Sequence, residues 1–288
     1  MKTLKRIFTI ILFVTTLQLA QAQHNIVLEN STLWKVEHTD LEKPSYIFGT
    51  MHMMCPSDFK LSEKLVKAMN EVDALVLEIN MSDPDEIKAM QTSMAATKKI
   101  SEELDTEQYQ KLDTLVRQVM GMPVANLDAY GLSMLNMIMM TKMLPCKEIK
   151  SYEAELMQMA QTKLMPIYSL ETVAEQIEIV KKSYPTDFAL EQIMLYDAYK
   201  KDFEASIISY KREALMETVA NLTKPEYMDE NATLHMQVLR NKNWVQQMPE
   251  MMEEGSNLFA VGAAHLTDEF GLIHLLREKG YTVSPVLN

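Results

Sequence analysis

The run YIFGTMH at residues 46–52 and the run LFAVGAAH at residues 258–265 decide how this sequence folds. Each run is apolar and strand-like, breaks at a glycine, and presents a histidine three residues after that glycine, at His52 and His265. Loops at the carboxyl edge of a sheet are where folds commonly place functional side chains. The two histidines therefore predict one shared site.

The sequence after each run repeats the same order of elements. A helical stretch from Asp58 to Glu71 and the β-rich run ALVLEI at 74–79 follow the first histidine. A helix from Asp268 to Lys279 and the run YTVSPV at 281–286 follow the second. The order strand, GxxH, helix, strand indicates a duplicated βαβ-like unit with parallel strands.

The first 22 residues have the order of a secretory signal peptide. Lys2, Lys5 and Arg6 precede the apolar run IFTIILFV at 7–14, and the small-residue exit AQA stands at 20–22. The apolar run is short for a membrane span, so we expect cleavage after residue 22, with an uncleaved anchor as the alternative. The mature chain, residues 23–288, is then expected in the periplasm or outside the cell, without a stable membrane span.

The chain is acidic. Its formal net charge is -12, and removing the three basic residues of the leader takes this to -15. Such a charge disfavours nucleic acids and anionic membranes as partners and leaves neutral or cationic substrates. The hydrophobic share of 47% and the charged share of 24% are those of an ordinary globular domain.

A long helical stretch separates the two repeated units. From about Pro84 to about Met252 the pattern is mostly helical, with one short strand-like run, IYSLE, at 167–171. No linker rich in glycine, serine or proline divides the chain. We expect a single α/β (α+β) domain at 23–288, with one central sheet and a helical insertion at about 84–252. The insertion is expected to cover the carboxyl edge of the sheet, where its many methionines would line an adaptable apolar groove.

Cys55 and Cys146 are the only two cysteines. In an exported protein they could form one disulfide, and the alternative is two separate small buried side chains. Both interpretations fit the sequence.

The candidate site combines two histidines with a carboxylate. His52 and His265 supply two ligand nitrogens, and Glu78 is the natural third ligand, because it ends an apolar strand where a lone carboxylate is costly to bury. The alternative is that Glu78 emerges into solvent. Glu171 ends the third strand-like run and is a candidate fourth ligand or general base, or simply an acid that begins the next helix.

Arg240 is a candidate for stabilising a developing oxyanion or binding a substrate carboxylate, because its guanidinium offers a fixed fork of donors. Nitrogen and oxygen ligands without a thiolate suit Mn, Co, Fe or Zn. No HExxH helix is present, so the site would not be that of a zincin.

Together these motifs resemble the TraB/GumN family, which includes the Tiki proteases. The resemblance is carried by both GxxH motifs, LE at 77–78, SLET at 169–172, EQ at 175–176, RN at 240–241, Trp244, VGAAHL at 261–266 and GYTV at 280–283. It implies a duplicated α/β fold in which the paired histidines and a glutamate form a divalent-metal site. Metal-dependent peptide cleavage is known for the Tiki branch, and pheromone shutdown is attributed to others. Asp268 departs from the pattern, because many relatives have a glycine there.

Two functions follow as expectations. The first is an exported divalent-metal-dependent hydrolase that acts on peptides through His52, Glu78 and His265, with Glu78 or Glu171 transferring the proton and Arg240 steadying the oxyanion. The second is a non-catalytic protein that sequesters a peptide or small ligand in the methionine-rich groove. Metal-dependent turnover separates them.

Overall fold

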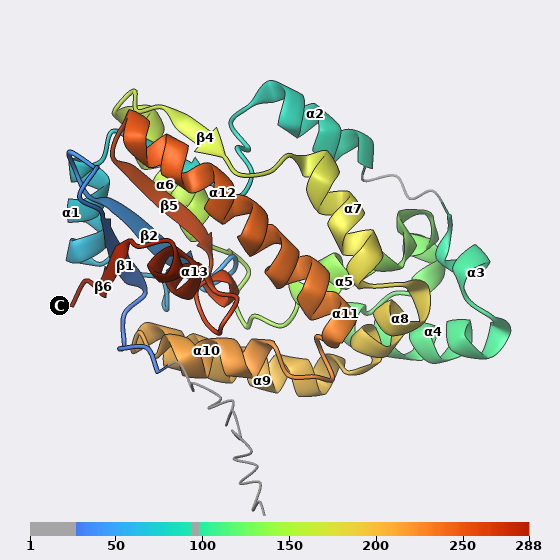
Figure 1. Cartoon of the computed structure of the whole chain (residues 1–288). Helices are drawn as coiled ribbons and strands as arrows, with labels where there is room; N and C mark the ends of the chain where they lie inside the picture. The colour runs from blue at the N-terminus through green and yellow to red at the C-terminus, as the bar shows by residue number, and fades with distance from the viewer. Residues whose placement is uncertain (1–26, 94–97, 288) are drawn as a thin grey trace, which may run out of the picture.

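A six-stranded mixed sheet forms the centre of the protein (Figure 1). The computed structural model describes residues 27–93 and 98–287, so the signal peptide predicted at 1–22 lies outside the described residues. The strands lie in the order β4-β3-β5-β2-β1-β6. Their bounds are β1 Leu33–Glu37, β2 Ser45–Thr50, β3 Ala74–Leu77, β4 Ile167–Ser169, β5 Asn257–Gly262 and β6 Thr282–Pro285.

The two repeated units interleave within this sheet. β5, from the second unit, pairs in parallel with β2 on one side and with β3 on the other. The register sets Thr50 opposite Gly262 and Leu77 opposite Ala260, so these strands end at the same edge. β4 is also parallel to β3, whereas β1 is antiparallel to β2 and β6. The predicted α/β fold with the duplicated units in one sheet is confirmed.

Helices cover the sheet and extend beyond its carboxyl edge. In Figure 1, α12 and α13 lie in front of the sheet and α6 lies behind it, while the arrowheads of β4 and β5 point toward the helical part of the molecule. The α-helices are α1 Glu63–Glu71, α2 Pro84–Ser93, α3 Ile100–Glu103, α4 Thr106–Met120, α5 Gly131–Met140, α6 Tyr152–Thr162, α7 Val173–Ser183, α8 Thr186–Met194, α9 Tyr196–Lys211, α10 Leu215–Leu222, α11 Glu230–Thr233, α12 Leu239–Glu254 and α13 Leu272–Glu278. Short 3-10 helices span Val124–Tyr130 and Ala263–His265, and a π-helical turn spans Leu234–Val238.

Both helices that follow the GxxH motifs begin later than the sequence predicts. α1 begins at Glu63 because the Ser62 hydroxyl caps it, accepting the Leu65 N–H at 3.3 Å. α13 begins at Leu272 because residues 268–271 form a turn instead: Asp268 has φ 69°, a left-handed conformation, the Gly271 N–H donates to the Asp268 carbonyl at 3.1 Å, and Gly271 is extended. A glycine would adopt this conformation at position 268 without strain.

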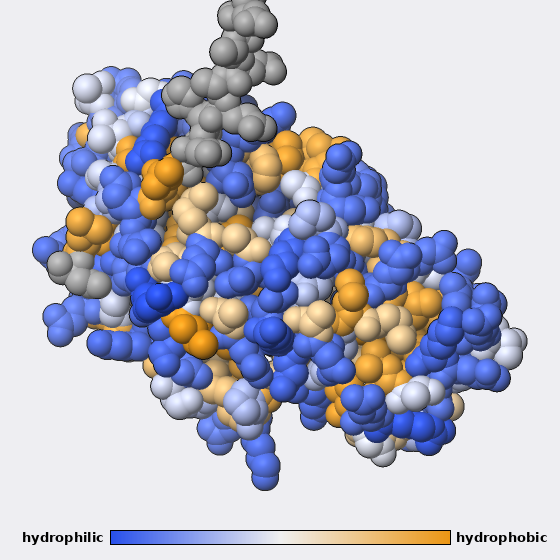
Figure 2. Space-filling model, turned by 90° about the horizontal axis from the view of Figure 1, so that it is seen from below, coloured by the Kyte–Doolittle hydropathy of each residue, from blue (hydrophilic) through white to orange (hydrophobic). Residues whose placement is uncertain are grey.

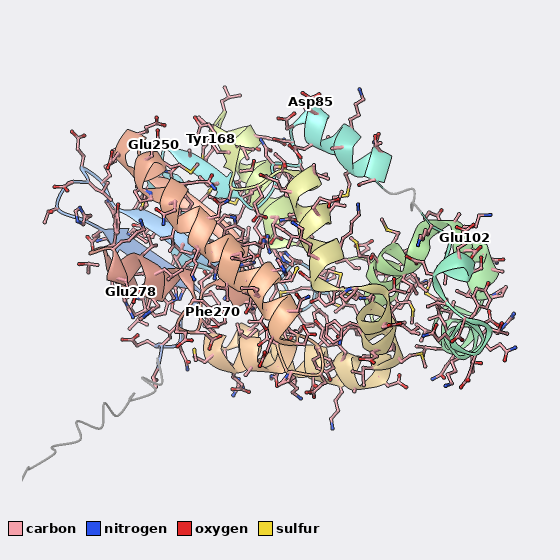
Figure 3. The ribbon with its side chains drawn as sticks, turned by 45° about the vertical axis from the view of Figure 1, so that its right-hand side comes forward. Asp85, Glu102, Tyr168, Glu250, Phe270 and Glu278 are labelled. Carbon is pink, nitrogen blue, oxygen red and sulfur yellow. A yellow bond between two sulfur atoms is a disulfide. The ribbon has the colours of Figure 1, made fainter. Side chains whose placement is uncertain are left out.

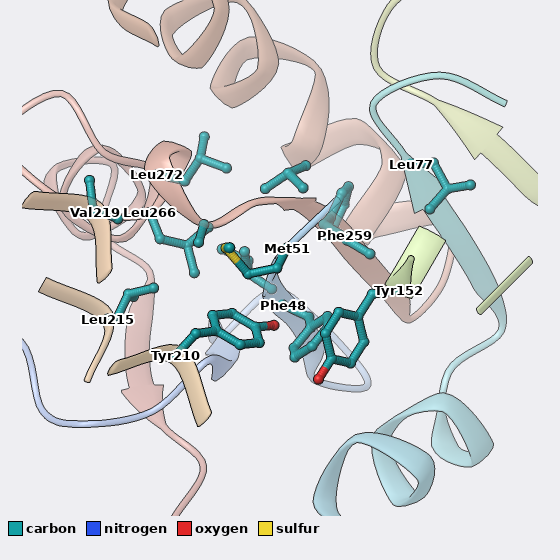
Figure 4. Close-up of a cluster of buried hydrophobic side chains, with 14 of the residues drawn as sticks. Phe48, Met51, Leu77, Tyr152, Tyr210, Leu215, Val219, Phe259, Leu266 and Leu272 are labelled. Atoms are coloured by element: carbon teal, nitrogen blue, oxygen red, sulfur yellow. The ribbon is translucent and has the colours of Figure 1, made fainter. Parts of the chain in front are cut away.

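The hydrophobic core reaches from the sheet to the first GxxH motif. Phe48 on β2 and Phe259 on β5 are both buried, on opposite faces of the sheet, because Phe259 pairs with Ile47 rather than with Phe48. The ring of Tyr152 meets the ring of Phe48 edge-on at 5.1 Å between centroids (Figure 4). Tyr210 packs beside Tyr152, and its hydroxyl donates to the Gly49 carbonyl at 2.7 Å. The core therefore fixes the backbone just before His52.

Cys55 and Cys146 form a disulfide, with their Cα atoms 5.7 Å apart. This answers the question that the sequence left open. Met54 and Lys150 also exchange two backbone hydrogen bonds of 2.9 Å. Both links tie the loop after His52 to the segment that precedes α6.

The face of the molecule seen from below is mostly polar (Figure 2). On this face, apolar side chains form separate patches between polar ones, the broadest at the end of the molecule that carries α3, α4 and α8. Within residues 27–93 and 98–287, no helix has the length and apolar character needed to cross a membrane.

Candidate functional site at the carboxyl edge of the sheet

Four parallel strands deliver the predicted site residues to one edge of the sheet. His52 follows β2, Glu78 follows β3, Glu171 follows β4 and His265 follows β5. His265 Nε2 lies 3.9 Å from Glu78 Oε1. A Cβ atom on Gly262 would lie 3.2 Å from His52 Nε2 and 3.3 Å from Glu78 Oε1, so both side chains line the same small space. The absence of a side chain at Gly262 keeps this space open.

Glu78 is held at both carboxylate oxygens. Oε1 accepts the Gly262 backbone N–H at 2.7 Å, while Oε2 accepts from Arg240 Nη2 at 2.6 Å and from Gln176 Nε2 at 3.2 Å. Burial would raise the pKa of Glu78, but the Arg240 charge, together with the Gly262 N–H, holds that pKa well below its usual range. Glu78 therefore does not emerge into solvent, since its side chain is 14% exposed.

His265 is a neutral imidazole with its proton on Nδ1. The Asn241 amide nitrogen donates to the carbonyls of His265 and Phe270, so Asn241 Oδ1 is the atom that faces His265 Nδ1, at 2.6 Å. Figure 3 shows Phe270 next to the α12 ribbon. His265 Nε2 must then accept, and it receives Arg240 Nη1 at 3.0 Å. Burial and the Arg240 charge lower the pKa of His265 to about 3.

His52 is held in the same way but lies near the surface. Its Nδ1 donates to Glu153 Oε1 at 2.8 Å, and the Thr50 hydroxyl donates to the same oxygen at 2.5 Å. Partial desolvation acts to lower the pKa of His52, but the Glu153 carboxylate outweighs it and raises that pKa to about 9. The side chain is 64% exposed, and its Nε2 faces the space beside Glu78.

Arg240 places its guanidinium at the centre of the site with all five N–H groups engaged. Nε donates to the Glu171 carboxylate at 3.0 Å, and Nη2 donates to both Glu78 and Glu171. Nη1 donates to the Met236 carbonyl at 3.2 Å and to His265 Nε2. No N–H remains in this arrangement for a substrate oxygen, so the predicted oxyanion contact requires the release of one bond.

Glu171 faces Arg240. It is buried, both of its oxygens accept from the guanidinium, and Oε1 also accepts from Trp244 Nε1 at 2.9 Å. Among the hydrogen bonds of the described residues, none joins Glu171 to either histidine. Its carboxylate orients Arg240, whose guanidinium also lies 4.7 Å from the Trp244 ring.

Helix α12 presents its site residues along one buried face. Arg240, Asn241, Trp244 and Met248 recur at helical spacing and are all buried. The π-helical turn Leu234–Val238 precedes them and directs buried Gln237 toward the Ala264 carbonyl, at 3.4 Å. Such turns often occur at functional sites, where they shift the helical register by one residue.

The donor types at this site suit a divalent metal, although Arg240 donates to one of the nitrogens that would bind it, His265 Nε2. Over residues 27–93 and 98–287, no group of three His, Cys, Asp or Glu side chains has the spacing to hold an ion as it stands. In this arrangement Arg240 Nη1 donates to the lone pair of His265 Nε2. Two imidazoles held through Nδ1 beside a carboxylate are nevertheless the ligand set and the support that metal sites use.

Sequence reasoning missed three contributors to the site, Glu153, Asn241 and Gln176. Asn241 and Gln176 stand within the motifs that carry the family resemblance, and helical spacing from Trp244 could have assigned Asn241 to the buried face. Glu153 lies 101 residues from His52, in the first turn of a helix. Acids are common there because a negative charge is favourable at a helix N-terminus. No local signal distinguishes it.

Comparison with known proteins gives a family match. No curated protein and no solved structure is significantly similar to the chain. The profile of the TraB/PrgY/gumN family matches residues 32–285. This range includes both GxxH motifs and every residue of the site described above, from Thr50 to Phe270. The chain therefore belongs to the TraB/PrgY/gumN family.

Proposed function

We propose that the protein is an exported, divalent-metal-dependent hydrolase that cleaves peptides. One observation carries the proposal: both GxxH histidines are held through Nδ1, by Glu153 and Asn241, so that Nε2 of each turns toward Glu78. Support of this kind fixes the tautomer of a metal-binding histidine and the direction of its lone pair.

The residues that would hold the ion are His52, Glu78 and His265. Their nitrogen and oxygen donors suit Mn, Co, Fe or Zn. When bound, such an ion lowers the pKa of a water molecule to about 7 and polarises a substrate carbonyl.

Arg240 and Glu78 would carry out the remaining chemistry. Gln176, Arg240 and the Gly262 N–H orient the Glu78 carboxylate, whose Oε1 faces the imidazoles and is the atom placed to accept a proton. Arg240 Nη1 donates to the His265 Nε2 lone pair, which an ion would also need. If an ion took that lone pair, this N–H of Arg240 would become free to donate to a substrate oxygen. Glu171 keeps the guanidinium in place during this exchange and is not assigned the role of base.

Substrate would approach from the side of His52. The His52 side chain is 64% exposed, whereas those of His265 and Arg240 are 7% and 5% exposed. The helices of the insertion stand beyond this edge of the sheet and would form the walls of the groove (Figure 1). The acidic composition favours a neutral or cationic peptide.

Two features support export. The order of residues 1–22 is that of a signal peptide, and the Cys55–Cys146 disulfide is typical of an oxidising compartment outside the cytoplasm. Location of the protein in fractionated cells tests this part of the proposal.

The central experiment compares metal content and peptide turnover in the purified wild type, His265→Gln and His274→Gln. His274 stands in a third GxxH match, but it lies within α13 and pairs with Glu278, so it is a matched control. We expect turnover that a chelator abolishes, that His265→Gln abolishes and that His274→Gln leaves unchanged. Peptide binding without turnover would contradict the hydrolase and support the alternative, a sequestering protein.

A further inference from the structure

Glu153 joins the site from a distant part of the chain. It lies in the first turn of α6, and its side chain is 23% exposed. Oε1 of Glu153 accepts two hydrogen bonds, from His52 Nδ1 at 2.8 Å and from the Thr50 hydroxyl at 2.5 Å. Both donors belong to the first GxxH motif, with Thr50 at the end of β2 and His52 just after it. Neither that motif nor the strand repeat includes Glu153.

Several links hold the segment of Glu153 against this loop. Ser151 caps α6 by accepting the Ala154 N–H at 3.1 Å, and the helix N-terminus favours a carboxylate in its first turn. The adjacent Tyr152 is buried in the core, and its hydroxyl donates to the Lys60 carbonyl at 3.0 Å. The Cys55–Cys146 disulfide and the backbone pairing of Met54 with Lys150 join the same two segments. The position of Glu153 relative to His52 is therefore determined by packing on both sides.

The two histidines have unequal partners. His265 donates to a neutral amide, Asn241, whereas His52 donates to a carboxylate. A carboxylate partner fixes the ring orientation and also makes the opposite nitrogen a stronger ligand. This support falls on the histidine that is more exposed and has less protein around it to fix its ring.

We propose that Glu153 is a positioning residue, which keeps the proton of His52 on Nδ1, directs Nε2 toward Glu78 and so raises the affinity of the site for a divalent cation. The part concerning the cation rests on the proposed function. The part concerning the tautomer of His52 stands on the hydrogen bond between His52 and Glu153.

The test measures Co²⁺ affinity and the visible absorption of bound Co²⁺ in the wild type, Glu153→Gln, Glu153→Ala and Glu155→Gln. Glu155 lies in the same turn of α6 and pairs with Lys150, so its substitution makes the same charge change without touching His52. We expect Glu153→Gln to bind Co²⁺ about 10- to 100-fold more weakly, and Glu153→Ala to bind more weakly still with an altered spectrum. Glu155→Gln should bind like the wild type.

Wild-type affinity and spectrum in both Glu153 variants would overturn the proposal. Thermal unfolding of each variant without added metal identifies any that fail to fold. Glu153→Gln keeps a hydrogen-bond acceptor and is therefore expected to retain the packing.

A wild type that binds no Co²⁺, Mn²⁺ or Zn²⁺ would refute the hydrolase instead. In that case nitrogen-15 spectra of the metal-free protein, in alkaline solution where imidazole is neutral, decide the tautomer. We expect the His52 proton on Nδ1 in the wild type and on Nε2 in Glu153→Ala; the same tautomer in both would overturn the proposal.

Discussion

Arg240 donates all five of its N–H groups to protein acceptors, and this sets the charge state of the residues around it. Its charge stabilises the Glu78 carboxylate as an anion. His265 must stay neutral, because a guanidinium can only donate and the imidazole nitrogen facing it can only accept. One arginine therefore fixes the ionisation of two neighbours, Glu78 and His265.

Glu78→Gln is expected to abolish metal retention and hydrolysis while the fold remains. The substitution removes the charged ligand, and the new amide directs donors at Arg240 or at the Gly262 N–H, where a carboxylate oxygen accepts now. We expect at least a 100-fold loss of metal affinity, more than for a supporting residue, and a loss of about 1–3 kcal/mol in the free energy of unfolding. Metal analysis and urea unfolding measure the two effects. Normal turnover in this variant would show that Glu78 is structural only.

The pairing of His52 with Glu153 predicts a pH-dependent stability in the absence of metal. Glu153 raises the pKa of His52 from 6.5 to about 9, so the folded protein holds this proton more tightly than the unfolded chain does. The pair therefore stabilises the fold fully below pH 6.5, and this contribution is lost as the pH rises through about 9. In urea unfolding with a chelator present, the free energy of unfolding of His52→Gln should fall furthest below that of the wild type at pH values under 6.5. The difference between the two proteins should shrink toward pH 9. A difference that does not change with pH would contradict the assignment.

Metal uptake should follow the opposite trend. An ion that binds His52 must displace its proton, so apparent affinity should rise about tenfold for each pH unit up to about 9. Calorimetric titrations in buffers of different ionisation enthalpy would count the proton released. Affinity that stays constant over this range would exclude His52 as a ligand.

At the scale of single elements, the end of α6 carries a strained residue. Leu164 follows the helix in the left-handed conformation, with φ 56°, and its side chain is 92% exposed. The Met165 N–H closes the turn on the Ala160 carbonyl at 2.9 Å, a helix end at which glycine is the usual residue.

Leu164→Gly should therefore raise the free energy of unfolding by about 1 kcal/mol, because the left-handed conformation costs about 1–2 kcal/mol in residues with a Cβ atom. Leu164→Ala is the matched control. It removes the same exposed side chain but keeps the Cβ atom, so it should bring little of this gain. Urea unfolding of the three proteins measures the difference. Equal stabilisation by both substitutions would locate the effect in the loss of exposed apolar surface instead.

Across the whole molecule, the sequence predicted the strand ends better than the links between distant segments. His52, Glu78 and His265 could be predicted because apolar runs that break at a polar residue mark strand ends, and parallel strands end together. The insertion of β5 between β2 and β3 could not, because strand order depends on pairing between remote segments. Glu153 escaped prediction for the same reason, since its contact with His52 spans 101 residues.

The disulfide should contribute both to stability and to the site. It joins residues 91 positions apart, and closing a loop of that length stabilises a protein by about 4.6 kcal/mol in the chain-entropy account. We expect Cys55→Ser combined with Cys146→Ser to lower the free energy of unfolding by about this amount and to weaken Co²⁺ binding, because the His52 loop loses a link to the segment of Glu153. Unchanged Co²⁺ affinity in the folded double variant would show that the remaining contacts suffice to hold that loop.

The guanidinium of Arg240 also has a consequence for how the protein matures. Small domains built around a structural zinc are unfolded without it, because the ion supplies the free energy of folding. Here Glu78 and Glu171 are already paired with a side chain of the same polypeptide. We therefore expect the newly made chain to complete its folding before it encounters any ion. The supply of metal in its surroundings would then set the fraction of working molecules, while the abundance of the protein stays the same.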